Sequence, residues 1–119
     1  MKKDSLHYYL IGIECLNKGH LDDAIINFNE SLMLEEHFKT YQKKAETLEK
    51  KGLYEESYNA LEKAYNLNPS NDNVATAFSK MLQKNGNSDK AIEILNAILK
   101  RNPTYSPAKK ILEQLGNAT

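Results

Sequence analysis

Apolar residues recur three and four positions apart along most of the chain, the spacing that gathers side chains on one face of an α-helix. The pattern comes in pairs, each with a first helix, a short turn and a second helix. First helices are expected at residues 5–17, 38–51 and 71–85, and second helices at residues 21–34, 54–67 and 88–101. The chain is therefore predicted to be all-α.

A glycine follows each first helix at a nearly fixed interval. Gly19, Gly52 and Gly86 are 33 and then 34 residues apart, and a glycine at this place suits a helix C-terminal cap. A fixed period of this size is typical of solenoids, in which each unit is too small to bury its own apolar face and stacks on its neighbours. Such a fold favours binding over catalysis.

The ends of the repeats indicate the domain organisation. Pro69 and Pro103 follow the second helices of repeats two and three, and proline cannot continue a helix. A capping helix is expected at residues 106–116, with Ser106 as its N-cap and Pro107 at its first helical position. The sequence thus predicts one domain over residues 1–119, with repeats at about 5–37, 38–71 and 72–105.

The charges balance overall but not locally. The chain carries 16 Lys and Arg against 16 Asp and Glu, so we expect neither a nucleic-acid partner nor a membrane partner. The net charge is −4 over residues 1–37, +1 over residues 38–71 and +3 over residues 72–119. An acidic start and a basic end would allow two chains to pair head to tail.

The single cysteine indicates a reducing compartment. Cys15 has no partner within the chain for a disulfide, and disulfides mark oxidising compartments. We therefore expect a cytoplasmic protein in which Cys15 is a small core residue.

No set of residues predicts catalysis, a metal site or a bound cofactor. His7, His20 and His37 are the only histidines, and none has another histidine four residues away. Glycine-rich phosphate loops, nucleophile elbows and convergent acid pairs are also absent from the sequence. Tyr54 and Tyr58 share a helix face with Tyr65, and this spacing favours packing over base stacking. The chain is therefore not expected to be an enzyme.

The positions that recur in register resemble the tetratricopeptide repeat family. They combine large, leucine-like and small residues on the first helix with small, large and small residues on the second, followed by proline. Repeat one offers Tyr8, Ile11, Gly12, Cys15, Ala24, Phe28 and Ser31; repeat two Tyr41, Ala45, Leu48, Ser57, Leu61, Ala64 and Pro69; repeat three Ala75, Phe78, Ser79, Leu82, Ala91, Leu95, Ile98 and Pro103. Glu36 replaces the usual proline of repeat one, and Lys44 replaces the leucine-like residue of repeat two. The resemblance implies a right-handed α-solenoid of three helix-turn-helix repeats plus a C-terminal capping helix.

The resemblance also implies where a partner would bind. In this family the concave surface formed by the first helices contacts an extended or helical peptide. One subset grips the C-terminal carboxylate of chaperone tails through a clamp of Lys, Asn and Arg. The matching positions here are Tyr9, Ile13, Lys43, Asn73 and Ala77. The clamp is absent, so a chaperone adaptor of that kind is disfavoured.

The first helix is apolar nearly all round although no repeat precedes it, and such a helix is normally buried on both sides. We therefore predict that a protein or peptide partner is anchored by Leu6, Tyr9, Ile13 and Leu16 and oriented by Lys43, Lys80 and Lys84. A homodimer through the same helix is the main alternative. Two others stay open: the N-terminus covers part of the stripe, or its residues are half-exposed. A nucleic-acid-binding helical repeat is a distant alternative, because the helices lack a basic stripe.

Overall fold

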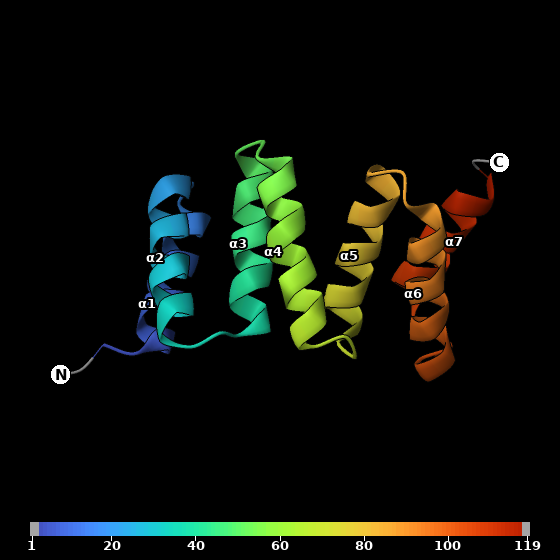
Figure 1. Cartoon of the computed structure of the whole chain (residues 1–119), viewed down its shortest axis with the longest axis horizontal. Coiled ribbons are helices and arrows are strands. Elements are labelled where there is room, and N and C mark those ends of the chain that lie inside the picture. Colours follow the sequence, from blue (N-terminus) through green and yellow to red (C-terminus); the bar gives the residue numbers. More distant parts are fainter. Residues whose placement is uncertain (1–2, 118–119) are drawn as a thin grey trace. The chain divides into compact units, whose positions relative to one another are not determined.

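The computed structural model describes residues 3–117, and all regular structure in that range is helical. The residues divide into two compact units, the first ending at Leu67 and the second beginning at Asn68. Figure 1 shows the order of the helices along the chain. They are α1 (Ser5–Asn17), α2 (Leu21–Leu34), α3 (Phe38–Lys50), α4 (Tyr54–Leu67), α5 (Asp72–Lys84), α6 (Ser88–Arg101) and α7 (Ser106–Asn117).

Six helices form the expected pairs, which confirms the all-α prediction. The helix α1 packs on α2, α3 on α4, and α5 on α6. Each second helix has the bounds predicted from the sequence, and the first helices differ by at most one residue at an end. Among the described helices, none is long and apolar enough to span a membrane.

The three repeat glycines end the first helices as predicted. Their φ angles are 79°, 81° and 82°, a left-handed conformation that a side chain disfavours. At Gly52, the amide N–H donates to the Glu49 carbonyl at 2.9 Å, and the next amide, of Leu53, donates to the Leu48 carbonyl at 2.9 Å. This pair of bonds is a Schellman motif. The same bonds occur around the other two glycines, so the turn is repeated along with the sequence.

In repeat one, the two helices meet at their smallest residue. A Cβ atom added to Gly12 would lie 2.5 Å from Cε1 of Phe28, a side chain with no exposed surface. The aromatic ring thus occupies the space that a side chain at position 12 would need. Repeat two places the larger Ala45 opposite the second helix, and its carbonyl accepts a 2.7 Å hydrogen bond from the buried Ser57 hydroxyl. The paired helices therefore pack closely in both repeats, but through different residues: Gly12 and Phe28 in repeat one, Ala45 and Ser57 in repeat two.

The first unit is also joined between its repeats. The helix α2 packs against α3, and the ammonium group of Lys51 pairs with the Asp22 carboxylate. Within repeat one, the buried Ser31 hydroxyl donates to the Ser5 carbonyl at 2.8 Å. The bond between Ser31 and Ser5 holds the start of α1 against α2.

In the second unit, α7 covers the last repeat. It packs on α6 and also contacts α5, and it buries Ala108, Ile111 and Leu115. The expected capping helix is thus present. The predicted N-cap is wrong by one residue: the Tyr105 carbonyl accepts from the Lys109 amide at 3.4 Å, so Tyr105 holds the cap position and Ser106 is the first helical residue.

Two side chains differ from their expected burial. Tyr54 is 65% exposed, so its predicted packing role is wrong, whereas Tyr58 and Tyr65 are half-buried. Tyr54 is the first residue of α4, two residues after Gly52 of the turn. Cys15 is half-buried and packs on the cluster of Leu16, Ala24 and Phe28 rather than within it.

Candidate functional site

The predicted apolar stripe of α1 divides into exposed and buried parts. Leu6 is 60% exposed, whereas Leu16 is only 7% exposed and belongs to the core cluster with Ala24 and Phe28. Tyr9 and Ile13 are half-buried and pack against the same cluster. The prediction that Leu16 lies on an exposed stripe is therefore wrong.

The physical reason lies in the helix period. Leu16 follows Gly12 by four residues, so both face α2, where the Phe28 ring lies directly against Gly12. Tyr9 lies beside this line, with its ring centroid 6.2 Å from that of Phe28. Leu10, which the stripe did not include, is 55% exposed. The exposed apolar surface of α1 is thus formed mainly by Leu6 and Leu10.

An open cavity of about 400 Å³ lies at the start of α1, and we name it the α1–α3 cavity. Leu6 and Tyr9 contribute its apolar surface, and residues from the α2–α3 connection and the start of α3 complete it. The lining residues are Ser5, Leu6, Tyr9, Glu35, His37, Lys39 and Thr40. The structure therefore brings two of the predicted anchors together with polar groups of the next repeat.

The polar side of the α1–α3 cavity is positioned by the end of one helix and the start of another. The imidazole Nδ1 of His37 accepts from the Lys39 amide at 3.2 Å and so caps α3. Glu35 follows the last residue of α2. A carboxylate and an ammonium group, from Glu35 and Lys39, thus stand at one cavity. Sequence reasoning missed Glu35, His37 and Thr40 as lining residues; their position at the repeat boundary was the available signal.

The predicted orienting lysines lie elsewhere. Lys43 is half-buried on α3, 3.6 Å from the Glu46 carboxylate, and it does not line the cavity. Lys80 and Lys84 are on α5 in the second unit, both exposed. Their role in orienting a partner stays a prediction.

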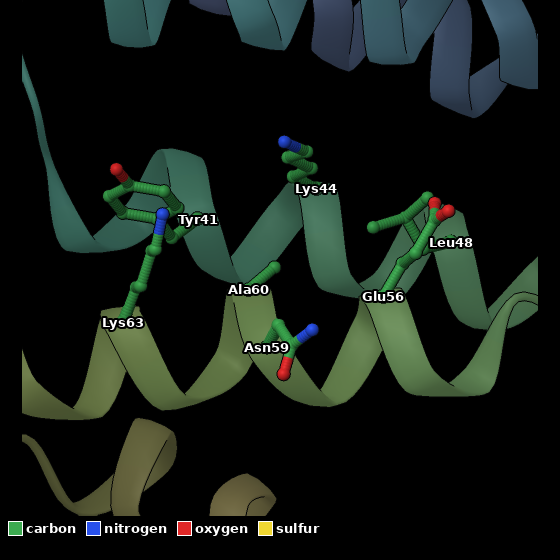
Figure 2. Close-up of a pocket in the computed structure, with 7 residues that line it drawn as sticks. All are labelled: Tyr41, Lys44, Leu48, Glu56, Asn59, Ala60 and Lys63. Atoms are coloured by element: carbon green, nitrogen blue, oxygen red, sulfur yellow. The ribbon is translucent and has the colours of Figure 1, made fainter.

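A second cavity, of about 220 Å³, lies on α3 and α4 (Figure 2), and we name it the α3–α4 cavity. The ammonium group of Lys63 lies 5.6 Å from the centroid of the Tyr41 ring, within the range of a cation–π contact. Lys44 is half-buried beside it, and burial lowers its pKa, with a further contribution from Lys63. The lining residues are Tyr41, Lys44, Leu48, Glu56, Asn59, Ala60 and Lys63.

Tyr41 at the edge of the α3–α4 cavity is held in its neutral form. Its side chain is 6% exposed, and its hydroxyl donates to Oε1 of Glu36 at 2.5 Å. Burial, together with the bond to Glu36, raises the pKa of Tyr41 to about 12. The neutral phenol donates to the carboxylate, whereas a phenolate would repel it.

The shift at Tyr41 predicts a dependence of stability on alkaline pH. The neutral Tyr41 phenol contributes to the stability of the fold. This contribution is fully present below pH 10.0, the pKa of tyrosine in the unfolded chain, and is lost as the pH rises toward 12. We expect this contribution to the free energy of unfolding to be at most about 3 kcal/mol, because each pKa unit corresponds to about 1.4 kcal/mol. Urea unfolding between pH 9 and pH 12 should therefore show a steeper fall for the wild type than for Tyr41→Phe. Parallel profiles for the two proteins would contradict this assignment.

The paired helices and the repeated glycine turn define a helical-repeat protein whose candidate sites are for binding. Among the described residues, no three His, Cys, Asp or Glu side chains gather as they would around a metal ion. The family model of the tetratricopeptide repeat matches residues 48–115, more than half of the chain. The chain belongs to the tetratricopeptide repeat family.

Solved structures with the same fold include domains described with peptides. The first tetratricopeptide domain of Spaghetti (RPAP3), bound to an HSP90 peptide, matches with a TM-score of 0.84 and 14% identity, over 99% of this chain and 94% of that one. The second such domain of human RPAP3, in complex with an HSP70 peptide, matches with a TM-score of 0.79 and 16% identity, over 94% of each chain. At these identities the likeness shows the fold alone.

A longer protein also contains this fold. The APC/C hetero-tetramer Cut9–Hcn1 matches with a TM-score of 0.79 and 22% identity, over 96% of this chain. This chain spans only 24% of the matched one. A search of curated proteins finds no match.

Proposed function

We propose that the chain is a noncatalytic protein-interaction module that captures an extended peptide or a partner helix on its first helices. The α1–α3 cavity carries this proposal, because it combines the 60% exposed Leu6 with Tyr9 at an open surface. Burial of each such side chain by a partner would contribute at most about 1.5–3 kcal/mol. The two RPAP3 domains are described with bound peptides, which supports a peptide as the class of ligand.

The polar groups of the cavity favour a peptide recognised along its length. The matched clamp positions hold Tyr9, Ile13, Lys43, Asn73 and Ala77, which lack the set of donors that a terminal carboxylate needs. Apolar side chains of the ligand would instead occupy the space beside Leu6 and Tyr9. Lys80 and Lys84 belong to the second unit, and their orienting of an acidic partner segment is a separate proposal.

The test is a selection of peptides from a random display library on the purified chain. Dissociation constants of the selected peptides are then measured by calorimetry. We expect Leu6→Lys and Tyr9→Ala to weaken binding by about tenfold or more, the effect typical of a central anchor. Ile26→Lys is the matched control, because Ile26 is 58% exposed and lies outside the cavity. Peptides that bind all three variants equally would refute the α1–α3 cavity as the site.

A homodimer through α1 is the second candidate, and the exposure of Leu6 and Leu10 favours it. The net charge of −4 over residues 1–37 opposes a symmetric pairing of two such surfaces. Sedimentation equilibrium over a wide range of concentration separates the two candidates. A wild-type dimer that Leu6→Lys reduces to a folded monomer assigns α1 to self-association, whereas a monomer at all concentrations leaves α1 for a different partner.

A further inference from the structure

Lys44 occupies a position that the other repeats fill with an apolar side chain. The residue in the same register is Ile11 in repeat one and Phe78 in repeat three, and Phe78 is only 1% exposed. A half-buried ammonium group at this position loses part of its hydration, which costs free energy that an apolar residue would not lose. Departures of this kind from the local pattern are found at functional sites. Lys44 therefore marks the α3–α4 cavity as a candidate binding site.

Two lysines line the cavity, and neither forms a close ion pair with a carboxylate, although the Glu56 carboxylate acts on Lys44 from a longer distance. Figure 2 shows Lys44 rising from α3 and Lys63 rising from α4 on the same side of the helices. Within residues 3–117, no carboxylate lies within 4 Å of either ammonium group. Burial and, after it, the charge of Lys63 lower the pKa of Lys44, whereas the Glu56 carboxylate raises it. An added negative charge between the two ammonium groups would offset their mutual repulsion.

The remaining lining residues limit the size and charge of a ligand. Glu56 lies at the Leu48 end of the cavity in Figure 2, so the two ammonium groups and one carboxylate leave a net charge of about +1. Asn59 offers an amide donor. The hydroxyl of Tyr41 is already bound to Glu36. A volume of about 220 Å³ fits a small group rather than a helix or an extended segment.

We propose that the α3–α4 cavity binds a carboxylate group between the ammonium groups of Lys44 and Lys63. A single negative charge would neutralise the cavity, whereas a phosphate dianion would leave an excess of negative charge beside Glu56. The carboxylate comes from a free small acid or from an acidic side chain of a bound peptide. This site is separate from the α1–α3 cavity, so the two proposals stand or fall independently.

The test follows backbone amide shifts by NMR at constant ionic strength. Sodium acetate, a capped tripeptide with a central glutamate, sodium phosphate and sodium chloride are added in separate titrations. We expect saturable shifts that centre on the residues lining the α3–α4 cavity for acetate or the tripeptide, and no saturation with chloride. Tighter binding of the tripeptide assigns the carboxylate to a peptide side chain, and equal or tighter binding of acetate assigns it to a free acid. Tighter binding of phosphate than of both carboxylates would overturn the proposal.

Matched variants test whether carboxylate binding is specific to the α3–α4 cavity. Lys44→Met and Lys63→Met should each weaken carboxylate binding about tenfold, the loss expected for a charge-assisted hydrogen bond. Lys50→Met is the control, because Lys50 is an exposed lysine at the end of the same helix α3. Equal weakening by all three variants would indicate general charge attraction and overturn the proposal.

A stability measurement separates a ligand-binding role of Lys44 from a structural one. Removing its half-buried charge should raise the midpoint of thermal unfolding of Lys44→Met by several degrees in the absence of added carboxylate. Added acetate should then raise the midpoint of the wild type more than that of the variant. A lower midpoint for Lys44→Met would show that the lysine serves the fold, and would overturn the proposal.

Discussion

Replacing Phe28 with alanine is expected to lower the free energy of unfolding by about 3–5 kcal/mol, the cost typical of a truncated core aromatic residue. Phe28 has no exposed surface and contacts the other members of the α1–α2 core. On α1 its ring stands opposite Gly12, which has no side chain to move into the vacated space. The cavity would therefore stay open. Domains of this size have about 5–15 kcal/mol of stability in total, so the loss is a large fraction of it.

The measurement is urea unfolding followed by far-ultraviolet circular dichroism. Tyr54→Ala is the matched control, since it also removes an aromatic side chain, but one that is 65% exposed. We expect the control to change the free energy of unfolding by at most about 0.5 kcal/mol. Similar losses for both variants would mean that the ring of Phe28 does not hold α1 against α2.

Gly12→Ala is expected to lower the free energy of unfolding by about 1–3 kcal/mol, although alanine is the better helix former. The new methyl group would lie 2.5 and 2.6 Å from two ring carbons of Phe28. A fully buried ring has no solvent-filled space into which it can rotate, so the helices must separate or the ring must leave its preferred rotamer. The steric cost therefore exceeds the gain in helix propensity.

Gly116→Ala gives the matched control for this substitution. Gly116 is also helical, on α7, and an added Cβ atom there would meet nothing within 4 Å. The control should leave stability unchanged or raise it by up to about 1 kcal/mol. Thermal and urea unfolding of both variants distinguish the steric effect from the propensity effect, and a stabilised Gly12→Ala would contradict the close contact.

A second substitution should rescue Gly12→Ala. Repeats two and three already place Leu61 and Leu95 where repeat one has Phe28, and they combine them with Ala45 and Ser79 in place of glycine. Phe28→Leu is therefore expected to cost less in the Gly12→Ala background than alone. A coupling energy of about 0.5–3 kcal/mol in the double-mutant cycle would confirm the contact, and strict additivity would contradict it.

Most of the helical structure could be predicted because its signals are local. The helix period, the three glycines and the two prolines depend on residues within a few positions of one another, and the observed bounds of the second helices agree with them. The positive φ angles at Gly19, Gly52 and Gly86 follow from the same local chemistry. Ser106 was chosen as N-cap because serine is preferred there and proline at the next position, but the bond from the Lys109 amide to the Tyr105 carbonyl starts the helix one residue earlier.

The candidate sites could be predicted only in part. On α1, apolar residues surround the helix, so the sequence offers no polar face by which to orient it. Contact with Phe28 decides the outcome, burying Leu16 and leaving Leu6 exposed. Glu35 and His37 were missed for a related reason: they join the cavity through the connection between repeats, which no helical period describes.

The sequence by itself determined the helices, their pairing, the turns between them and the family of this chain. The helices and turns follow from spacings of a few residues, and the family follows from the period of 33 and 34 residues at which the pattern recurs. Tertiary structure decided which apolar residues of α1 remain at the surface and which side chains meet in the two cavities. Lys44 illustrates the difference. Its departure from the repeat pattern is visible in the sequence, but its neighbour Lys63 is 19 residues away and reaches it only because α4 folds back along α3.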